Sequence, residues 1–415
     1  MKQFEKKEKE FLTNTLTSFF NKKDADEFLE KFLIIEGNKS KSHQVNSKEK
    51  EQINLSIPDN YKINTQIDLL ITFAETRLPR NKFLELLLLL GQFTITSSEL
   101  YFSIYIHERI LTETKNNTSL SSLSAQSAIA LGEIYSKQAN WKLSFNYVKQ
   151  ANAIFKSIND IKGSANCENL LGTIYGEIGN LSKAKIHFEK SLSLLEKIND
   201  NALKGKLEIN LGIIYNILGD FENAISYYRR ALLNFEKIKD LKRIAEIRHN
   251  MGMLYTKKNQ YDSAIQEFDR CIATAMQTGY LFSIGIAYLS KAFIYSLQND
   301  FYLAEAFADK ALEICSNTND KLSIADIYKI KGIIQRKLKK YNLSENYFLT
   351  SIRLNKELQN ELNLAESNLE LGILYKELKR IDESKNCLIN SLKYFKKIKA
   401  SNEIKSINGL LNSFI

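Results

Sequence analysis

Residues 168–200 read ENLLGTIYGEIGNLSKAKIHFEKSLSLLEKIND, and residues 208–240 read EINLGIIYNILGDFENAISYYRRALLNFEKIKD. The two stretches align without a gap at a spacing of forty residues, which places Gly172 on Gly212. A fixed period of this size indicates that one supersecondary element is stacked on copies of itself. We therefore expect a repeat array whose core runs along the stack.

Five columns of residues recur at this spacing. The first holds Gly132, Gly172, Gly212, Gly252, Ala292, Gly332 and Gly372, and the second holds Tyr135, Tyr175, Tyr215, Tyr255, Tyr295, Gln335 and Tyr375. Two columns of small residues follow, namely Ser144, Ala184, Ala224, Ala264, Ala304, Ser344 and Ser384, then Ala151, Ser191, Ala231, Cys271, Ala311, Ser351 and Ser391. Between them lies a mostly bulky column of Val148, Phe188, Tyr228, Phe268, Ala308, Phe348 and Leu388. Their spacings of three, four and seven put them on single faces of two successive helices.

These columns predict an antiparallel helix pair in each repeat. Small side chains let two helix axes approach closely, and the aromatic side chains fill the space between neighbouring pairs. Short polar turns such as Gly179-Asn180 join the two helices. Only two prolines and 16 glycines occur in 415 residues, which leaves few turn residues for strands and hairpins. A wholly disordered chain is excluded because 44% of the residues are hydrophobic.

The pattern Leu-Gly-x-x-Tyr, followed by Ala, Phe and Ala at these spacings, resembles the tetratricopeptide repeat. Seven repeats fit residues 124–400. The forty-residue period is similar to that of kinesin light chain, Rap-type and MalT-type proteins, although the early tryptophan and the closing proline are missing. The resemblance implies an all-α fold, a right-handed superhelical α-solenoid of antiparallel helix pairs. It also implies that the first helices line a concave groove that binds a peptide or protein segment.

The chain outside the seven repeats divides into four further segments. Residues 1–36 are expected to form an N-terminal helical segment, with an amphipathic pattern that changes near Asp24. Residues 37–61 are polar and are expected to form a linker. Residues 62–123 resemble a degenerate repeat, and residues 401–415 suit a capping helix over the last repeat.

The resemblance also implies candidate groove residues on the first helices. The residue just before Leu-Gly faces the groove in the family, and here it is an asparagine twice. The full candidate set is Asn166, Asn169, Lys206, Asn210, Asn216, Glu246, His249, Asn250 and Lys257. An asparagine amide both donates and accepts hydrogen bonds, which suits capture of an extended peptide backbone. Each residue singly also fits a solvated helix face, whereas the set favours a groove.

The formal charge of +10 is concentrated late in the repeats. Residues 1–120 balance at 17 basic and 17 acidic side chains, whereas residues 321–360 hold nine basic and three acidic ones. This excess defines a candidate basic patch of Lys331, Arg336, Lys337, Lys339 and Lys340. Such a patch could dock an acidic partner or nucleic acid, or it could reflect only a lysine-rich composition. No aromatic residues interleave with the basic ones as in strand-binding surfaces, which argues against nucleic acid.

Catalytic, metal and membrane signatures are missing from the sequence. No phosphate-loop, dinucleotide, esterase or zincin motif occurs, and no histidine has ligand partners at metal spacing. We therefore expect no enzyme, no cofactor and no metal. Four widely spaced cysteines, charged first residues and the lack of a long apolar run predict a cytoplasmic protein without membrane insertion.

Two functions are compatible with these observations. The first is a noncatalytic scaffold or adaptor that holds a peptide or protein segment in the groove. The alternative is a peptide- or ligand-sensing regulator of Rap or MalT type, in which residues 1–36 relay the output. The sequence leaves both open and does not identify the partner.

Overall fold

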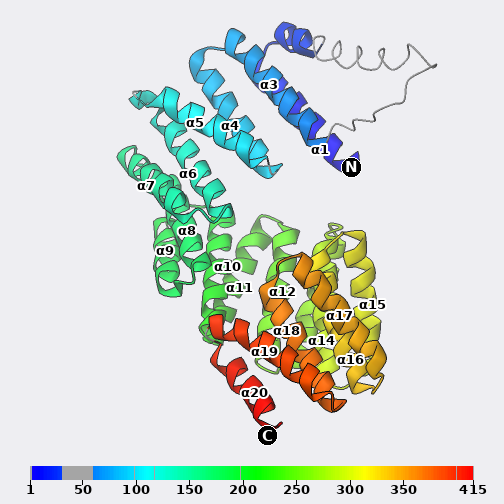
Figure 1. The fold of residues 1–415 in the computed structure, drawn as a ribbon. Helices are drawn as coiled ribbons and strands as arrows, with labels where there is room; N and C mark the ends of the chain where they lie inside the picture. Colours follow the sequence, from blue (N-terminus) through cyan, green and yellow to red (C-terminus); the bar gives the residue numbers. More distant parts are fainter. Residues whose placement is uncertain are drawn as a thin grey trace, which may run out of the picture. The chain divides into compact units, whose positions relative to one another are not determined.

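The computed structural model describes residues 2–29, 59–97, 99–115, 117–196, 198–398 and 400–414 (Figure 1). Within these ranges the chain forms helices joined by turns, and none of these residues is in a strand. The all-α solenoid of antiparallel helix pairs expected from the sequence is confirmed. Most of the expected linker 37–61 lies outside the described residues, and its last three residues begin a helix.

The chain divides into two compact units, which we call the N-terminal unit (Met1–Asp200) and the C-terminal unit (Asn201–Ile415). The helices of the N-terminal unit are α1 (Lys2–Phe19), α3 (Asp59–Arg77), α4 (Arg80–Thr96), α5 (Leu100–Thr114), the 3-10 turn η1 (Thr118–Leu120), α6 (Ser121–Lys137), α7 (Trp141–Ser157), α8 (Ile161–Glu177) and α9 (Leu181–Leu194). Residues 22–29 are also helical.

The helices of the C-terminal unit begin at intervals of twenty residues. They are α10 (Asn201–Ile217), α11 (Phe221–Lys237), α12 (Leu241–Lys257), α13 (Tyr261–Met276), α14 (Leu281–Leu297), α15 (Phe301–Asn317), α16 (Lys321–Lys337), α17 (Tyr341–Glu357), α18 (Glu361–Glu377), α19 (Ile381–Lys397) and α20 (Ser401–Asn412). Each even-numbered helix from α10 to α18 is the first of a pair and packs along the next odd-numbered helix.

Side-chain caps and left-handed turn residues fix these helix boundaries. The Asp160 carboxylate accepts a hydrogen bond from the Gly163 backbone N–H at 2.8 Å, which caps α8. Between paired helices the middle loop residue has a positive φ, as at Gly179 (84°) and Asn299 (61°). Glycine and asparagine tolerate this conformation best. Helix α9 has 14 residues where most of its equivalents have 17, and it is the last helix of the N-terminal unit.

The small-residue columns place the paired helices in direct contact. A Cβ added at Gly252 would lie 2.5 Å from the Phe268 ring, so only glycine lets α12 approach α13 this closely. Where the first small column holds serine, the hydroxyl donates to the carbonyl of the glycine twelve residues earlier, as from Ser344 to Gly332 at 2.8 Å. The contact recurs between α4 and α5, where Ser103 donates to the Gly91 carbonyl at 3.0 Å.

Buried apolar side chains continue through each unit. In the N-terminal unit, Leu16, Leu70 and Phe83 join α1, α3 and α4 in one cluster. At the other end of the chain, Ile407 of α20 is fully buried beside Leu388 and Phe395 of α19. None of the described helices combines the length and the apolar character needed to cross a membrane.

Candidate functional site

The first helices of the C-terminal unit form a continuous row. Helix α12 contacts α14, α14 contacts α16, and α16 contacts α18, in addition to the contact of each with its own partner. Helix α10 joins the row because Lys257 Nζ of α12 donates to Asn216 Oδ1 of α10 at 3.3 Å. These helices share one surface on the side of these contacts, and we call it the first-helix face. It is formed by α10, α12, α14, α16 and α18.

The candidate groove residues lie on three first helices. Lys206, Asn210 and Asn216 are on α10, and Glu246, His249, Asn250 and Lys257 are on α12, so the structure brings these seven together in the C-terminal unit. Asn166 and Asn169 are half-buried on α8, which belongs to the N-terminal unit. The role of all nine in ligand binding stays a prediction.

His249 connects α12 to α14. Its Nε2 lies 3.1 Å from Ser290 Oγ, and its ring packs against Phe268 with centroids 5.5 Å apart. Burial lowers the pKa of His249 to about 4. The imidazole is therefore neutral near pH 7, and it acts there as a hydrogen-bonding group without charge.

Glu246 and Asn250 differ in how far they are already engaged. Tyr280 donates its hydroxyl to Glu246 Oε1 at 3.1 Å, and Arg243 forms an ion pair with Glu246 at 2.7 Å. The half-buried amide of Asn250, by contrast, makes no hydrogen bond to any of the residues that the structure describes. The donors and the acceptor of the Asn250 amide are thus available to a ligand.

Helices α16 and α18 are tied by ion pairs on the same face, in which Arg336 is buried and its partner Glu377 is exposed. Lys329 of α16 pairs with Asp326 at 3.1 Å and with Glu366 of α18. Arg336 of α16 pairs with Glu370 at 2.7 Å and with Glu377 at 2.9 Å, both on α18. Burial raises the pKa of Glu370, and the Arg336 guanidinium opposes that shift.

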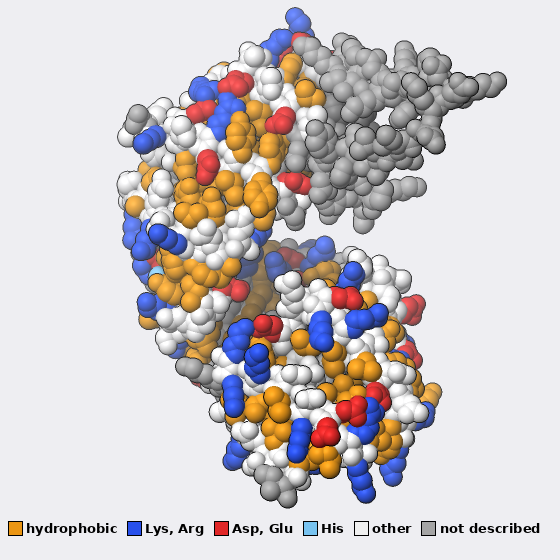
Figure 2. Space-filling view, in the orientation of Figure 1, with side chains coloured by type: hydrophobic (Ala, Val, Ile, Leu, Met, Phe, Trp, Pro, Cys, Tyr) orange, Lys and Arg blue, Asp and Glu red, His pale blue; other side chains and the backbone are white. Residues whose placement is uncertain are grey.

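The candidate basic patch is divided between buried and exposed side chains. Lys331 is buried and forms an ion pair with Asp309 of α15, and Arg336 is buried between its two carboxylates. Lys337, Lys339 and Lys340 are exposed. On the face of the C-terminal unit in view, basic and acidic side chains are interspersed rather than gathered by sign (Figure 2). Only three of the five predicted residues are therefore accessible to a partner.

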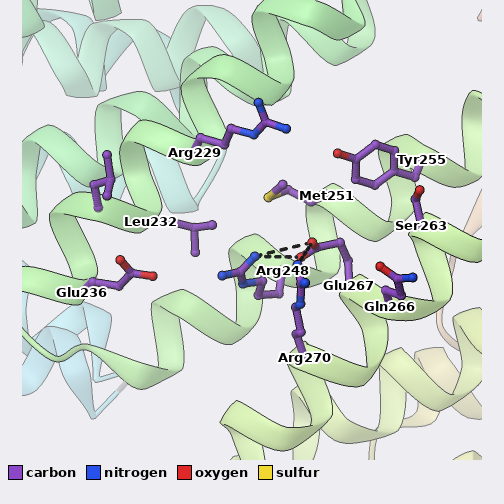
Figure 3. Close-up of a pocket in the computed structure, with 11 residues that line it drawn as sticks. Arg229, Leu232, Glu236, Arg248, Met251, Tyr255, Ser263, Gln266, Glu267 and Arg270 are labelled. Atoms are coloured by element: carbon purple, nitrogen blue, oxygen red, sulfur yellow. Dashed lines mark hydrogen bonds and ion pairs between the residues drawn. The ribbon is translucent and has the colours of Figure 1, made fainter.

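A pocket of about 520 Å³ lies between the second helices α11 and α13, over α12. Arg248 and Arg270 both pair with the buried Glu267, at 3.1 and 2.7 Å, and Arg229 lies apart from them (Figure 3). The central charges of this pocket are engaged with one another. No sequence motif predicts this pocket, because its residues come from three different helices.

Comparisons with known proteins agree with this architecture. Residues 123–197 and 205–277 match the family model described as tetratricopeptide repeat. A search among curated proteins gave no match. The chain is similar to the crystal structure of aspartyl phosphate phosphatase F from Bacillus subtilis, with a TM-score of 0.60 and 14% identity over 84% of this chain and 91% of that one.

Two further solved structures have the same fold. The apo form of the quorum sensor NprR from B. thuringiensis has a TM-score of 0.60 and 15% identity over 81% of this chain and 94% of that one. A Rap protein complexed with Competence and Sporulation Factor has a TM-score of 0.58 and 15% identity over 82% and 93%. Identities this low establish a shared fold. The repeat match shows that residues 123–197 and 205–277 of this chain consist of tetratricopeptide repeats.

Proposed function

We propose that the chain is a noncatalytic scaffold that binds an extended peptide or protein segment on the first-helix face of the C-terminal unit. The observation that carries this proposal is the half-buried Asn250 amide without a hydrogen-bonding partner among the described residues. It lies one turn from the exposed Met253 and forty residues after its equivalent, Asn210. An amide beside apolar surface suits a peptide backbone and its side chains at once.

The test uses a displayed library of random twelve-residue peptides selected on the full chain. Peptides enriched on the wild-type protein are synthesised, and their affinities are measured by fluorescence anisotropy. The Asn250→Ala variant should bind them about tenfold more weakly, because a peptide hydrogen bond in a partly dry site is lost. Asn346→Ala on the second helix α17, where the side chain is exposed, should change nothing. Equal losses in both variants would remove the first-helix face from the proposal.

A peptide-sensing role is the second candidate, and the packing of the N-terminal helices favours it. Helices α1, α3 and α4 share one apolar cluster, so a displacement of one of these helices would displace the others. Similar structures include a quorum sensor and a Rap protein bound to Competence and Sporulation Factor. Hydrogen exchange in α1, α3 and α4 distinguishes the two roles. The exchange rates should change on peptide binding if the chain is a sensor and stay constant if it is an adaptor.

We also propose a cytoplasmic location and the absence of catalysis. The four cysteines are free, and Cys167, Cys271 and Cys315 are buried, which fits a reducing compartment. No group of three or more His, Cys, Asp or Glu side chains among the described residues could hold a metal ion. Because one similar structure is a phosphatase by name, release of phosphate from an aspartyl phosphate protein is the activity to assay.

A further inference from the structure

Three first helices carry exposed, mostly apolar side chains at equivalent positions of the repeat. Each helix contributes two residues one turn apart, and we call these six the α10–α14 patch: Ile213 and Ile217, Met253 and Lys257, Phe293 and Leu297. The five apolar members are between 36% and 56% exposed. Apolar surface that spans several helices is typical of an interaction site, whereas single exposed apolar residues are ordinary.

Contacts between the helices bring their parts of the patch next to one another. Ser290 Oγ of α14 lies 3.6 Å from Met253 Sδ of α12, and Lys257 of α12 reaches Asn216 of α10. Neighbouring helix axes lie roughly 8–10 Å apart, so three helices span about 20 Å. An extended chain rises about 3.3 Å per residue, and roughly six residues therefore cover the patch.

Lys257 is the single charged member of the patch and lies on its middle helix. The side chain is exposed, and its ammonium donates to a neutral amide oxygen, that of Asn216, at 3.3 Å. It forms no ion pair with the residues that the structure describes, whereas the adjacent Lys258 pairs with Glu222 at 2.7 Å. Unlike Lys258, the Lys257 ammonium is available to a carboxylate from a partner.

We propose that the α10–α14 patch selects a peptide segment with one Asp or Glu between aliphatic or aromatic residues. The carboxylate binds Lys257, and the apolar side chains cover Ile213 and Ile217 on one side and Phe293 and Leu297 on the other. In an extended segment, side chains two residues apart point the same way, so the apolar residues should lie about two positions from the acid. This inference rests on the proposed peptide-binding function and specifies its ligand.

The experiment repeats the peptide selection on the wild type and on Lys257→Glu. Peptides enriched on the wild type should carry an acidic residue with apolar residues about two positions away. Peptides enriched on Lys257→Glu should carry Lys or Arg where those enriched on the wild type carry the acidic residue. Replacing the acid of the best peptide by Lys should weaken its binding to the wild type about tenfold and restore it on Lys257→Glu, because a charge pair is reformed.

Lys237→Glu is the matched control. Lys237 is exposed on the second helix α11, outside both the first-helix face and the candidate basic patch. The same change of charge there should leave the acidic preference intact, which separates a local contact from an effect of net charge. Circular dichroism of both variants checks that the fold is retained.

The outcomes separate this inference from the function on which it rests. Enriched peptides without an acidic preference, or a preference that survives Lys257→Glu, would overturn the inference. If those peptides still bind Asn250→Ala more weakly than the wild type, the proposed function stands without this inference. A selection that enriches no peptide on the wild type would overturn both.

Discussion

The first-helix face of the C-terminal unit has two chemically different halves. On α10, α12 and α14 it presents exposed apolar side chains, the Asn250 amide, which makes no hydrogen bond to the described residues, and Lys257, which forms no ion pair with them. On α16 it carries Lys329 and Arg336, which pair with carboxylates of α16 and α18. The same backbone register therefore supports an open half (α10, α12 and α14) and a paired half (α16 and α18), in which Lys329 and Arg336 are engaged in ion pairs. If the proposed function holds, we expect a ligand to gain most from the open half, because no existing pair has to be broken there.

The largest expected effect is a loss of stability when the ion pairs of the paired half are removed. Arg336→Met leaves Glu370 and Glu377 without their guanidinium, and removal of one partner from a buried pair costs about 3 kcal/mol of unfolding free energy. Urea denaturation with hydrogen exchange of α18 measures this loss. Thr256→Ala, at the same register position on α12, should cost less than about 1 kcal/mol because its hydroxyl bonds only to the Gly252 carbonyl. Equal costs would remove the distinction between the halves.

The second prediction concerns peptide binding by the open half. Phe293→Ala removes the largest exposed side chain of the α10–α14 patch and should weaken binding of the selected peptides about 30-fold, as truncation of an aromatic anchor does. Its register equivalent on α18 is Ile373, and Ile373→Ala should change the affinity less than about twofold. Fluorescence anisotropy measures both. A larger loss with Ile373→Ala would place the ligand on the paired half instead.

The third prediction assigns opposite pH responses to the two halves. Because the pKa of His249 is lowered to about 4, the folded protein binds fewer protons than the unfolded chain between that value and about 6.5. His249 therefore stabilises the fold fully above pH 6.5, and about 2 kcal/mol of this is lost by pH 5. The raised pKa of Glu370 acts the other way: its stabilisation is present at low pH and is lost as the pH rises through that raised value.

Two variants separate these responses. His249→Gln should flatten the fall in stability between pH 7 and pH 5, measured by urea denaturation at each pH, whereas Glu370→Gln should steepen it. His107 of the N-terminal unit also has a pKa lowered to about 4 by burial, so both variants retain its contribution. An unchanged profile for His249→Gln would show that α12 does not respond to acid as proposed.

The smallest expected effect is on stability at the centre of the patch. Lys257→Gln should change the unfolding free energy by less than about 0.5 kcal/mol, because the side chain is exposed and has no ion pair among the described residues. A thermal melt checks this. A large loss would mean that Lys257 holds α10 to α12, and its effect on peptides would then be indirect.

Much of the fold could be predicted from the columns alone. The spacing of Gly252 and Phe268 predicted a close helix pair, and the Phe268 ring does occupy the place of a Cβ at Gly252. The short end of α9 could not be predicted, because residues 198–200 (Ile-Asn-Asp) repeat the letters found at 158–160. Local sequence sets where a turn can form, and the packing around it decides how many residues the helix retains.

The candidate site was predicted in part. Asn210 and Asn250 were chosen from their register, which also places His249 and Ser290 on neighbouring helices. Counting charges could not show that Arg336 is buried between carboxylates 34 and 41 residues later in the chain. A basic residue counts the same in a composition whether it is solvated or paired.

The sequence by itself determined the helix pairs, their period of forty residues and the columns that join them. These depend on local periodicity and on side-chain volume, both of which are properties of short stretches. Only the tertiary structure decided which half of the first-helix face stays open. That choice depends on which side chains meet across neighbouring repeats, and an ion pair forms or fails according to distance and burial rather than spacing.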